Sequence, residues 1–295
     1  MTEIQTVLST LGYLKKLSGT TLLVKLGGST LQCLEEKPWI YEDLATLRTA
    51  GISVVLVHGG GPMINAELKA RNISWEMVDG QRVTTPEIMK VVESVLYGTV
   101  NRNIVRGLNV AGIPAVGISG IESSTLFCKS AGPALGQVGI IEDIDTSLME
   151  SILNTTTKDG FGAIPVVAPI GMGKEGDTFN INADWAASRI AQFLKIKKVL
   201  FLTDQNGILD SDGTVLPELD ASELDQLIES GVVQGGMLTK TRTILDALRN
   251  GVGAVHVING NRPHAIVEEL FTEAGVGSVC RLRSRVATQP GKGGE

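Results

Sequence analysis

The sequence has little cysteine and no long apolar run. Its 3 cysteines, Cys33, Cys128 and Cys280, are odd in number and have no paired spacing. This pattern argues against a disulfide framework and a zinc knuckle, so we expect reduced thiols and a cytoplasmic protein. No run of about 18 apolar residues occurs, and the N-terminus has no basic start followed by an apolar stretch. We therefore expect neither a membrane span nor a signal peptide.

Positive charge is also scarce. The chain has 26 Lys and Arg against 32 Asp and Glu, which gives a formal net charge of −6. Without an overall basic field, nucleic acid is not an expected partner. In contrast, 43% of the 295 residues are hydrophobic, which is ample for one large α/β domain or two lobes.

Strand-like and helix-like patterns alternate from residue 21 onward. Strands are expected near 21–26, 53–57, 114–118, 163–168, 198–202 and 254–258. Helices are expected near 40–50, 62–71, 86–110, 146–158, 183–194, 221–230, 238–250 and 264–273. This alternation predicts βαβ units around a parallel sheet. The Gly- and Ser-rich stretch 119–145 predicts hairpins at one edge, and the lack of a long linker predicts that any two lobes share one sheet.

An amphipathic helix is expected before the first strand. Its apolar residues recur at helical spacing: Ile4, Val7, Leu8, Leu11, Leu14 and Leu17. The sequence shows no segment of the same chain against which this helix would pack. We therefore expect its apolar stripe to pack against another subunit. At the other end, residues 287–295 are polar and Gly-rich, and we expect them to be frayed.

Two strands each end in a glycine-rich loop. Lys25-Leu26-Gly27-Gly28 follows the first apolar run, and His58-Gly59-Gly60-Gly61 follows the second. Glycines without side-chain bulk let backbone N–H groups approach an anion closely. Pro62 suits the first turn of the next helix, so free N–H groups and a positive helix end coincide there. The loops predict a phosphate or carboxylate site.

The familiar nucleotide fingerprints do not fit. No Gly-x-x-x-x-Gly-Lys-Ser/Thr occurs, which disfavours a P-loop enzyme. The segment 171–176 matches Gly-x-Gly-x-x-Gly, yet it runs into Asp177-Thr178-Phe179 instead of opening a helix. We interpret it as a hairpin turn.

Two further motifs open helices. In Asn180-Ile181-Asn182-Ala183-Asp184, an N-cap and an acidic first turn account for Asn182 and Asp184 but leave Asn180 unexplained. Gly235-Gly236-Met237-Leu238-Thr239-Lys240 places a lysine in the first turns of a helix, where a cation opposes the helix dipole. A lysine there indicates an anion for it to meet.

The last two motifs follow strands or turns. Gly80-Gln81-Arg82-Val83-Thr84 is weak evidence alone, because surface arginines are common. Leu202-Thr203-Asp204-Gln205-Asn206-Gly207 comes directly after a strand, where α/β folds place ligands.

Taken together and in this order, the six motifs that begin at Lys25, His58, Gly80, Asn180, Leu202 and Gly235 closely resemble those of the N-acetylglutamate kinases of the amino-acid kinase family. The resemblance covers about residues 10–282. It implies a three-layer αβα sandwich around an open, mainly parallel eight-stranded sheet, with an extra N-terminal helix. It also implies transfer of the γ-phosphoryl group of ATP to the side-chain carboxylate of N-acetyl-L-glutamate, the second step of arginine biosynthesis.

The resemblance further implies a division of the chain into three parts. Residues 1–19 would form an oligomerisation helix. Residues 20–179 would form an N-terminal lobe that binds the acyl acceptor and makes dimer contacts. Residues 180–295 would form a C-terminal lobe that binds ATP and holds an arginine site.

Site roles carry over by resemblance to matching positions. Lys25 and Lys240 would neutralise phosphoryl oxygens, with Asp184 ionised between them. The acceptor residues would be Gly60, Gly61, Arg82 and Asn180. The ATP residues would be Gly27, Gly28, Asp204, Gly207, Gly235, Gly236 and Met237. No carboxylate cluster accompanies the motifs, so Mg²⁺ would be held by nucleotide phosphates and water rather than by protein ligands.

A second layer of resemblance concerns control. Residues 1–17 resemble the N-terminal helix of arginine-inhibited members, which assemble as hexamers, a trimer of dimers. The candidate residues for an L-arginine site are Tyr13, His256, Glu269 and Gly275. Simpler interpretations stay open: His256 as a satisfied core histidine and Glu269 on a solvated helix face.

The sequence departs from the family pattern at two places. Leu26 stands where many arginine-sensitive relatives have tyrosine, and Ile121-Glu122-Ser123-Ser124 replaces a more usual Lys-Asp-Gly hairpin.

Two alternative functions stay open. One alternative is a module that senses arginine or docks a nitrogen-signalling protein, with catalysis secondary. The other is a kinase for a longer acid such as N-acetyl-aminoadipate, because one methylene changes binding by only ~1 to 3 kcal/mol.

Overall fold

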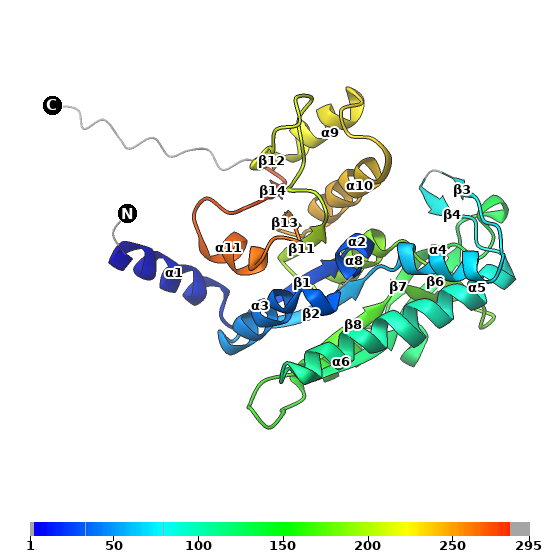
Figure 1. The fold of residues 1–295 in the computed structure, drawn as a ribbon, viewed down its shortest axis with the longest axis horizontal. Coiled ribbons are helices and arrows are strands. Elements are labelled where there is room, and N and C mark those ends of the chain that lie inside the picture. The colour runs from blue at the N-terminus through cyan, green and yellow to red at the C-terminus, as the bar shows by residue number, and fades with distance from the viewer. Residues whose placement is uncertain (1–2, 33, 79, 284–295) are drawn as a thin grey trace.

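The computed structural model describes residues 3–32, 34–78 and 80–283, and Figure 1 shows its course. The expected frayed tail at 287–295 and Cys33 lie outside the described residues. Cys128 and Cys280 are free and buried, as expected of reduced thiols. Among the described residues, no helix is both long and hydrophobic enough to span a bilayer.

An eight-stranded sheet runs through the molecule (Figure 1). Its strands, in spatial order, are β12 (Glu218–Asp220), β14 (Ser278–Arg281), β13 (Ala254–Asn259), β11 (Lys198–Thr203), β1 (Thr21–Leu26), β2 (Ser53–His58), β8 (Ile164–Ala168) and β5 (Ala115–Ser119). The strands from β13 to β5 pair in parallel, whereas β14 is antiparallel to β13 and parallel to β12. The expectation of an open, mainly parallel eight-stranded sheet is confirmed.

Helices cover both faces of this sheet and make three layers. The first face carries α2 (Gly28–Leu31), α3 (Pro38–Thr49), α4 (Gly61–Ala70), α5 (Pro86–Glu93), α6 (Arg102–Val110) and α11 (Ala265–Phe271). The second face carries α7 (Ser147–Asn154), α8 (Ala183–Phe193), α9 (Ala221–Glu229) and α10 (Gly235–Arg249). On β1, Leu22 and Val24 belong to the first core and Leu23 to the second, as the two-residue period of a strand requires.

The long helix expected over 86–110 is interrupted in its middle. Between α5 and α6 lies a π-helical segment, η2 (Ser94–Asn101), that continues both without a break. The ends of the expected helix are correct. Its hydrophobic pattern gave no sign of the π-helical turn.

A smaller sheet and a hairpin complete one end of the molecule. The sheet consists of β10 (Thr178–Asn180), β9 (Ile170–Met172), β6 (Leu126–Ser130) and β7 (Gly139–Ile144). The segment 171–176 makes the turn of the antiparallel β9–β10 pair, so its interpretation as a hairpin is confirmed. The hairpin β3 (Met77–Val78) and β4 (Gln81–Arg82) projects separately, as Figure 1 shows. Short 3-10 turns occur at Leu34–Glu36, Glu122–Ser124 and Pro133–Leu135.

The N-terminal helix α1 (Glu3–Leu17) is only partly unpartnered, which corrects our expectation. Tyr13, Leu14 and Leu17 pack against the first core, and α1 contacts α11. The outer part of the stripe stays exposed within this chain: Ile4, Val7, Leu8 and Leu11. The physical reason is that the C-terminal turns of α1 reach a neighbouring helix of the same chain, whereas the N-terminal turns extend beyond it.

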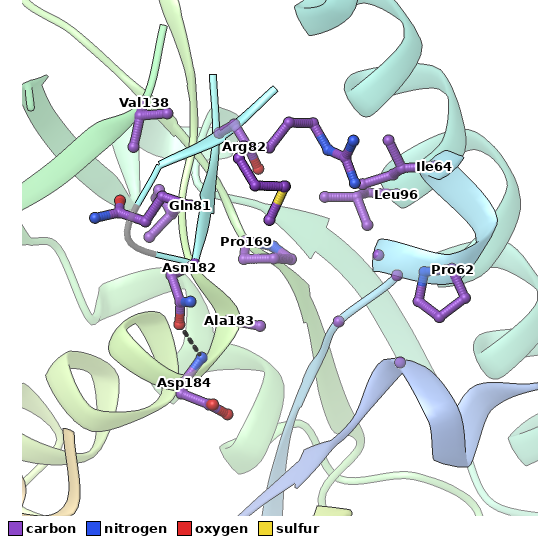
Figure 2. A pocket seen from close by; sticks show the side chains of 18 of the residues that line it. Pro62, Ile64, Gln81, Arg82, Leu96, Val138, Pro169, Asn182, Ala183 and Asp184 are labelled. Atoms are coloured by element: carbon purple, nitrogen blue, oxygen red, sulfur yellow. Dashed lines mark hydrogen bonds between the residues drawn. The ribbon is translucent and has the colours of Figure 1, made fainter. Parts of the chain in front are cut away.

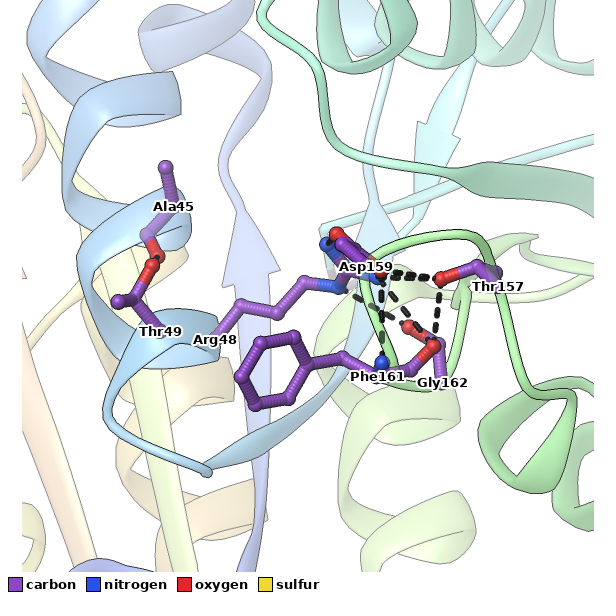
Figure 3. Close-up of polar contacts among 7 residues, drawn as sticks. All are labelled: Ala45, Arg48, Thr49, Thr157, Asp159, Phe161 and Gly162. Atoms are coloured by element: carbon purple, nitrogen blue, oxygen red, sulfur yellow. Dashed lines mark hydrogen bonds and ion pairs between the residues drawn. The ribbon is translucent and has the colours of Figure 1, made fainter.

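Arg48, in the last turn of α3, fixes the loop between α7 and β8 (Figure 3). Its Nε donates to the carbonyl oxygen of Gly162 at 3.0 Å, and its Nη2 donates to Thr157 Oγ1 at 2.8 Å. The guanidinium also pairs with Asp159 and lies 5.4 Å from the centre of the Phe161 ring. These contacts lie at the amino end of β8, at the edge of the parallel sheet opposite to the carboxyl ends of its strands.

Candidate active site

Two lysines from distant parts of the chain meet on one carboxylate. Lys25 Nζ lies 2.7 Å from Asp184 Oδ1, and Lys240 Nζ donates to Asp184 Oδ2 at 2.9 Å. The side chains of Lys25, Asp184 and Lys240 are only 8%, 12% and 9% exposed. The convergence expected from the sequence is confirmed.

Local structure explains why these three groups converge. Strand alternation places Lys25 on the same face of β1 as Leu23, toward α8 and α10. Asp184 lies in the first turn of α8, where Asn182 Oδ1 accepts hydrogen bonds from the N–H groups of Asp184 (2.9 Å) and Trp185 (3.3 Å). Asn182 is therefore the N-cap that the sequence predicts, and it fixes the point at which Asp184 enters the site.

The electrostatics of the trio favour an ionised Asp184. Burial raises the pKa of this carboxyl group, but Lys240 and Lys25 outweigh burial and hold the pKa well below its usual range. Burial lowers the pKa of Lys25, and the Asp184 carboxylate opposes that effect. Lys240 Nζ also lies 5.2 Å from the centre of the Phe201 ring on β11. A negative charge held between two cations leaves one net positive charge to face an anionic ligand.

The glycine loops after β1 and β2 lie against each other. The N–H of Gly27 donates to the carbonyl of Leu202 at 2.8 Å, and the N–H of Gly59 donates to the carbonyl of Leu26 at 2.9 Å. A Cβ atom on Gly28 would lie 2.7 Å from Pro62 Cδ, so only glycine permits this approach. The two loops together present backbone at the carboxyl ends of the strands.

A first cavity of about 310 Å³ lies beside the trio and under the β3–β4 hairpin. We call it the hairpin cavity; Figure 2 shows its wall, with Arg82 opposite Asp184. The predicted residues that line it are Lys25, Gly28, Gly60, Gly61, Arg82, Asn180 and Asp184. All four predicted acceptor residues therefore surround one space.

Arg82 is the cation on the far wall of the hairpin cavity. Its side chain is buried, its Nη2 donates to Asn65 Oδ1, and its guanidinium lies 5.4 Å from the centre of the Trp75 ring. Nη1 is buried without a hydrogen-bond partner among the described residues. Such an atom is suited to a carboxylate, which accepts a forked pair from arginine.

Three supports of this wall were not predicted from the sequence. They are Asn65, Trp75 and Thr84, whose Oγ1 accepts a hydrogen bond from Asn180 Nδ2 at 3.1 Å. Asn65 lies one helical turn after Gly61, so the helix expected over 62–71 could have indicated that it faces the same region. Trp75 and Thr84 lie in loops, and no pattern indicated their partners.

A second cavity, of about 620 Å³, lies on the other side of the trio. The predicted nucleotide residues that line it are Gly27, Gly28, Asp204, Gly236 and Met237. Lys25, Gly28, Ser29 and Asp184 line both cavities, so the two spaces meet at the trio. Ser29 was not predicted, although it directly follows the Gly27-Gly28 pair.

Two predicted nucleotide residues are not among those that line the second cavity. Gly207 is buried, and a Cβ atom there would lie 2.6 Å from Ser278 Oγ and 2.8 Å from Val215 Cγ1. It therefore allows close packing of the loop after β11 against β14. Gly235 begins α10 and is exposed, with φ of +53°, a conformation that favours glycine.

The residues predicted for an arginine site come together in part. His256 Nδ1 lies 2.5 Å from Glu269 Oε1, and Glu269 Oε2 accepts hydrogen bonds from the N–H groups of Val276 (2.8 Å) and Gly277 (3.1 Å). Gly275 adjoins this carboxylate, at φ of +61°. Tyr13 lies on α1 and packs against the first core.

This cluster decides between the simpler interpretations. Glu269 is buried, so its placement on a solvated helix face is wrong; the reason is that it faces β13 and caps backbone N–H groups. His256 is buried and paired, which agrees with a satisfied core histidine. Burial lowers the pKa of His256, and the hydrogen bond that the ring donates to Glu269 opposes that effect.

The described part of the chain offers no ready-made set of metal ligands. No group of three or more His, Cys, Asp or Glu side chains there is arranged to hold a metal ion. Both oxygens of Asp184 already face lysines. The donors that the site offers are ammonium and N–H groups, which suit phosphate oxygens.

The fold has three α/β layers, and its two cavities meet at Lys25 and Asp184, with Lys240 on the wall of the second cavity. This arrangement at the carboxyl ends of the strands defines a class of enzymes that act on anionic substrates. A model of the amino acid kinase family matches residues 20–259, and the chain belongs to this family.

Within this family, the chain is clearly similar to acetylglutamate kinases. An acetylglutamate kinase of Ruegeria pomeroyi is 42% identical over 276 residues, which are 94% of this chain and 94% of that protein. An acetylglutamate kinase of Neisseria meningitidis is 40% identical over 277 residues, with 91% of each chain covered.

Solved structures share the fold. The N-acetylglutamate synthase of Neisseria gonorrhoeae, in complex with coenzyme A and N-acetyl-glutamate, matches 97% of this chain with a TM-score of 0.83 and 24% identity. This chain spans 65% of that longer protein. Carbamate kinase of Giardia lamblia, bound to AMP-PNP, matches 89% of this chain and 98% of its own, with a TM-score of 0.62 and 16% identity.

Proposed function

We infer that this protein is an acetylglutamate kinase, which uses ATP to phosphorylate the side-chain carboxylate of N-acetyl-L-glutamate in arginine biosynthesis. Relatives of that activity are 40–43% identical over more than nine-tenths of the chain. The single observation that carries the mechanism is the trio of Lys25, Asp184 and Lys240 at the meeting point of two cavities. Two substrates, one in each cavity, would react there.

The hairpin cavity suits the acceptor. Arg82, with its free Nη1, would bind the α-carboxylate, and Asn180 would contact the N-acetylated end. The backbone at Gly60 and Gly61 would face the reacting carboxylate. The forked pair would fix the orientation of the acceptor, and alignment supplies much of the rate of phosphoryl transfer.

The second cavity suits ATP. Its walls include Asp204, Gly236 and Met237, which would contact the nucleotide, and Gly27 and Gly28, which would approach the phosphates. Lys25 and Lys240 would neutralise charge on the transferred phosphoryl group, and Asp184 would hold both ammonium groups in place. Mg²⁺ supplies further charge neutralisation when it arrives with ATP; it would be coordinated by nucleotide oxygens and water.

The proposal includes control and assembly. L-arginine would act as an effector near Tyr13, His256, Glu269 and Gly275, of which the last three already adjoin one another. The exposed stripe of α1 would join subunits into a hexamer, a trimer of dimers. The protein would act in the cytoplasm, where ATP is available and free thiols such as Cys128 persist.

A coupled assay of ADP release tests these statements. We expect turnover with N-acetyl-L-glutamate, a lower catalytic efficiency with N-acetyl-aminoadipate, and slower turnover when L-arginine is added. Equal efficiency with the longer acid would reassign the acceptor. Absence of ADP release with either acid, together with binding of L-arginine by calorimetry, would instead favour an arginine-sensing module.

A further inference from the structure

A buried polar chain lies directly beneath the glycine loop after β2. His58, the last residue of that strand, is fully buried, and its Nδ1 lies 2.8 Å from the carbonyl oxygen of Gly59. Its Nε2 lies 3.2 Å from Asn101 Nδ2, which also donates to the carbonyl oxygen of Val166 on β8 at 2.8 Å. The chain therefore connects the glycine loop to the central sheet.

The contacts fix where the imidazole proton resides. A carbonyl oxygen only accepts, so Nδ1 carries the hydrogen that is donated to Gly59. Nε2 then presents a lone pair, which accepts one of the two hydrogens of Asn101 Nδ2; the other goes to Val166. Burial lowers the pKa of His58 to about 4, with the Gly59 carbonyl opposing and the Lys25 charge adding to the effect. A neutral ring therefore gives both imidazole nitrogens a hydrogen-bond partner.

The π-helical segment η2 explains how Asn101 reaches His58. Residues five apart are stacked in a π-helix, which has i→i+5 hydrogen bonds, whereas in an α-helix they point about 140° apart. Leu96 and Asn101 are five apart in η2; Leu96 lies against Gly60 of the loop, and Asn101 contacts His58, which precedes the loop. A Cβ atom on Gly60 would overlap Leu96 Cδ2, so the same segment supports the next residue of the loop.

A second contact, between Asn101 and Gly117, also fixes the position of the Asn101 side chain. Its Oδ1 is buried without a hydrogen-bond partner among the described residues. Gly117 on β5 leaves room for that oxygen, since a Cβ atom there would overlap Oδ1. An unsatisfied buried oxygen is costly, so packing alone would favour an apolar side chain here.

We propose that His58 and Asn101 are positioning residues for phosphoryl transfer, held by the π-helical turn so that the N–H groups of the Gly59-Gly60-Gly61 loop keep their place beside Lys25 and Asp184. The inference rests on the proposed function. Neither side chain lines the cavities; both act through the backbone of the loop.

Two substitutions at His58 separate positioning from simple filling of space. In His58→Asn, the side-chain amide can donate to Gly59 as Nδ1 does; in His58→Gln, the amide reaches the place of Nε2 and the donor to Gly59 is lost. His58→Asn keeps the donor to Gly59 but loses the contact with Asn101, so we expect kcat to fall by about threefold. His58→Gln loses the donor to Gly59, so we expect kcat to fall on the order of 10- to 100-fold, with KM for ATP little changed in both variants. Gln is closer to His in volume, so a space-filling role predicts the reverse order, and that order would overturn the proposal.

Amide hydrogen exchange gives a readout that needs no substrate. In Asn101→Leu we expect exchange of the peptide spanning Gly59–Gly61 to rise at least about tenfold, because the loop loses its support. Arg48→Met is the matched control, since it breaks the polar contacts of a buried arginine at the opposite edge of the sheet (Figure 3). It should lower Tm and leave both loop exchange and kcat near wild type. Unchanged loop exchange in Asn101→Leu would contradict the proposal, whereas an inactive wild type would contradict only the proposed function.

Discussion

Asp184 shows how a single residue sets the geometry of the site. Because its two oxygens bind different lysines, Lys25 and Lys240 are held apart and both point toward the junction of the cavities. Removing one partner of a buried charge cluster costs more than the pair contributes, because a charge is then left unpaired. The trio is most informatively probed by removing one lysine, which leaves the other paired with Asp184.

We predict that Lys240→Ala folds and loses on the order of 100-fold or more in kcat, comparable to removal of one preorganised charge-stabilising donor. The measurement is initial-rate ADP release, with Tm recorded in parallel. Lys129→Ala is the control, because Lys129 is an exposed lysine that pairs with Glu142 on the small sheet. Turnover of Lys240→Ala close to that of the control would end the assignment of Lys240 to catalysis.

A second prediction at this scale concerns pH and His58. Its pKa is about 4 in the folded chain against about 6.5 when unfolded, so the unfolded chain binds a proton that the folded chain does not. Stability from this group is complete above the unfolded pKa and decreases as the pH falls toward the folded pKa. Between about pH 7.5 and about pH 4.5, wild type should lose about 2.5 kcal/mol more stability than His58→Asn. Urea unfolding of both proteins at the two pH values measures this difference, and parallel pH profiles would contradict it.

How far single residues could be predicted depended on their neighbours in the sequence. Lys25 and Lys240 were predictable because each adjoins a glycine pair at the end of a strand or the start of a helix. One interpretation placed Glu269 on an exposed helix face, which was wrong. Its partners, His256 and the Gly275–Gly277 turn, come from other elements and could not be recognised from its own helix. Asn65 was missed for the same reason, since its partner Arg82 lies on a hairpin.

At the scale of elements, the Arg48 cluster ties α3 to the loop that precedes β8 (Figure 3). We predict that Arg48→Met lowers the free energy of unfolding by about 2 kcal/mol, because hydrogen bonds to the Gly162 and Phe161 carbonyls are lost. Asp159 is exposed on the other side of the pair, so Asp159→Asn should have a smaller effect. Urea unfolding of both variants checks the order, and a larger loss in Asp159→Asn would show that the charge, not the backbone contacts, holds the loop.

Element types were predicted well, and the misses have physical causes. Hydrophobic periodicity alone predicts the long amphipathic or apolar segments, such as α3 and β11. The π-helical turn of η2 was not predicted, because it goes with contacts to other elements, those of Leu96 with Gly60 and of Asn101 with His58, which its composition does not reveal. The strands β12 and β14 were missed since both are short, β12 pairs with β14, and β14 pairs with β13 as well.

At the scale of the whole molecule, the shared sheet explains why the two halves of the chain form one site. β1, from the first half, pairs in parallel with β11, from the second, so the loops after both strands emerge at the same edge. The hairpin cavity lies mainly on one side of this seam and the second cavity on the other. A rotation of one half of the chain relative to the other would change the distance between the two substrates without changing the lining of either cavity.

The exposed part of α1 leads to the last prediction. Ile4, Leu8 and Leu11 lie on one stripe, exposed by 72%, 63% and 54%, and each leucine buried in an interface contributes about 1.5 to 3 kcal/mol. We predict that the double substitution Leu8→Glu, Leu11→Glu converts the proposed hexamer to dimers, because charged groups on that stripe resist desolvation.

Molar mass from light scattering after size exclusion measures this change, and Lys69→Glu, at an exposed position of α4, controls for added negative charge. Turnover without arginine should stay near wild type, since no residue of α1 lines either cavity. A hexamer that survives the double substitution would show that α1 does not join the dimers, and the stripe would then need another role.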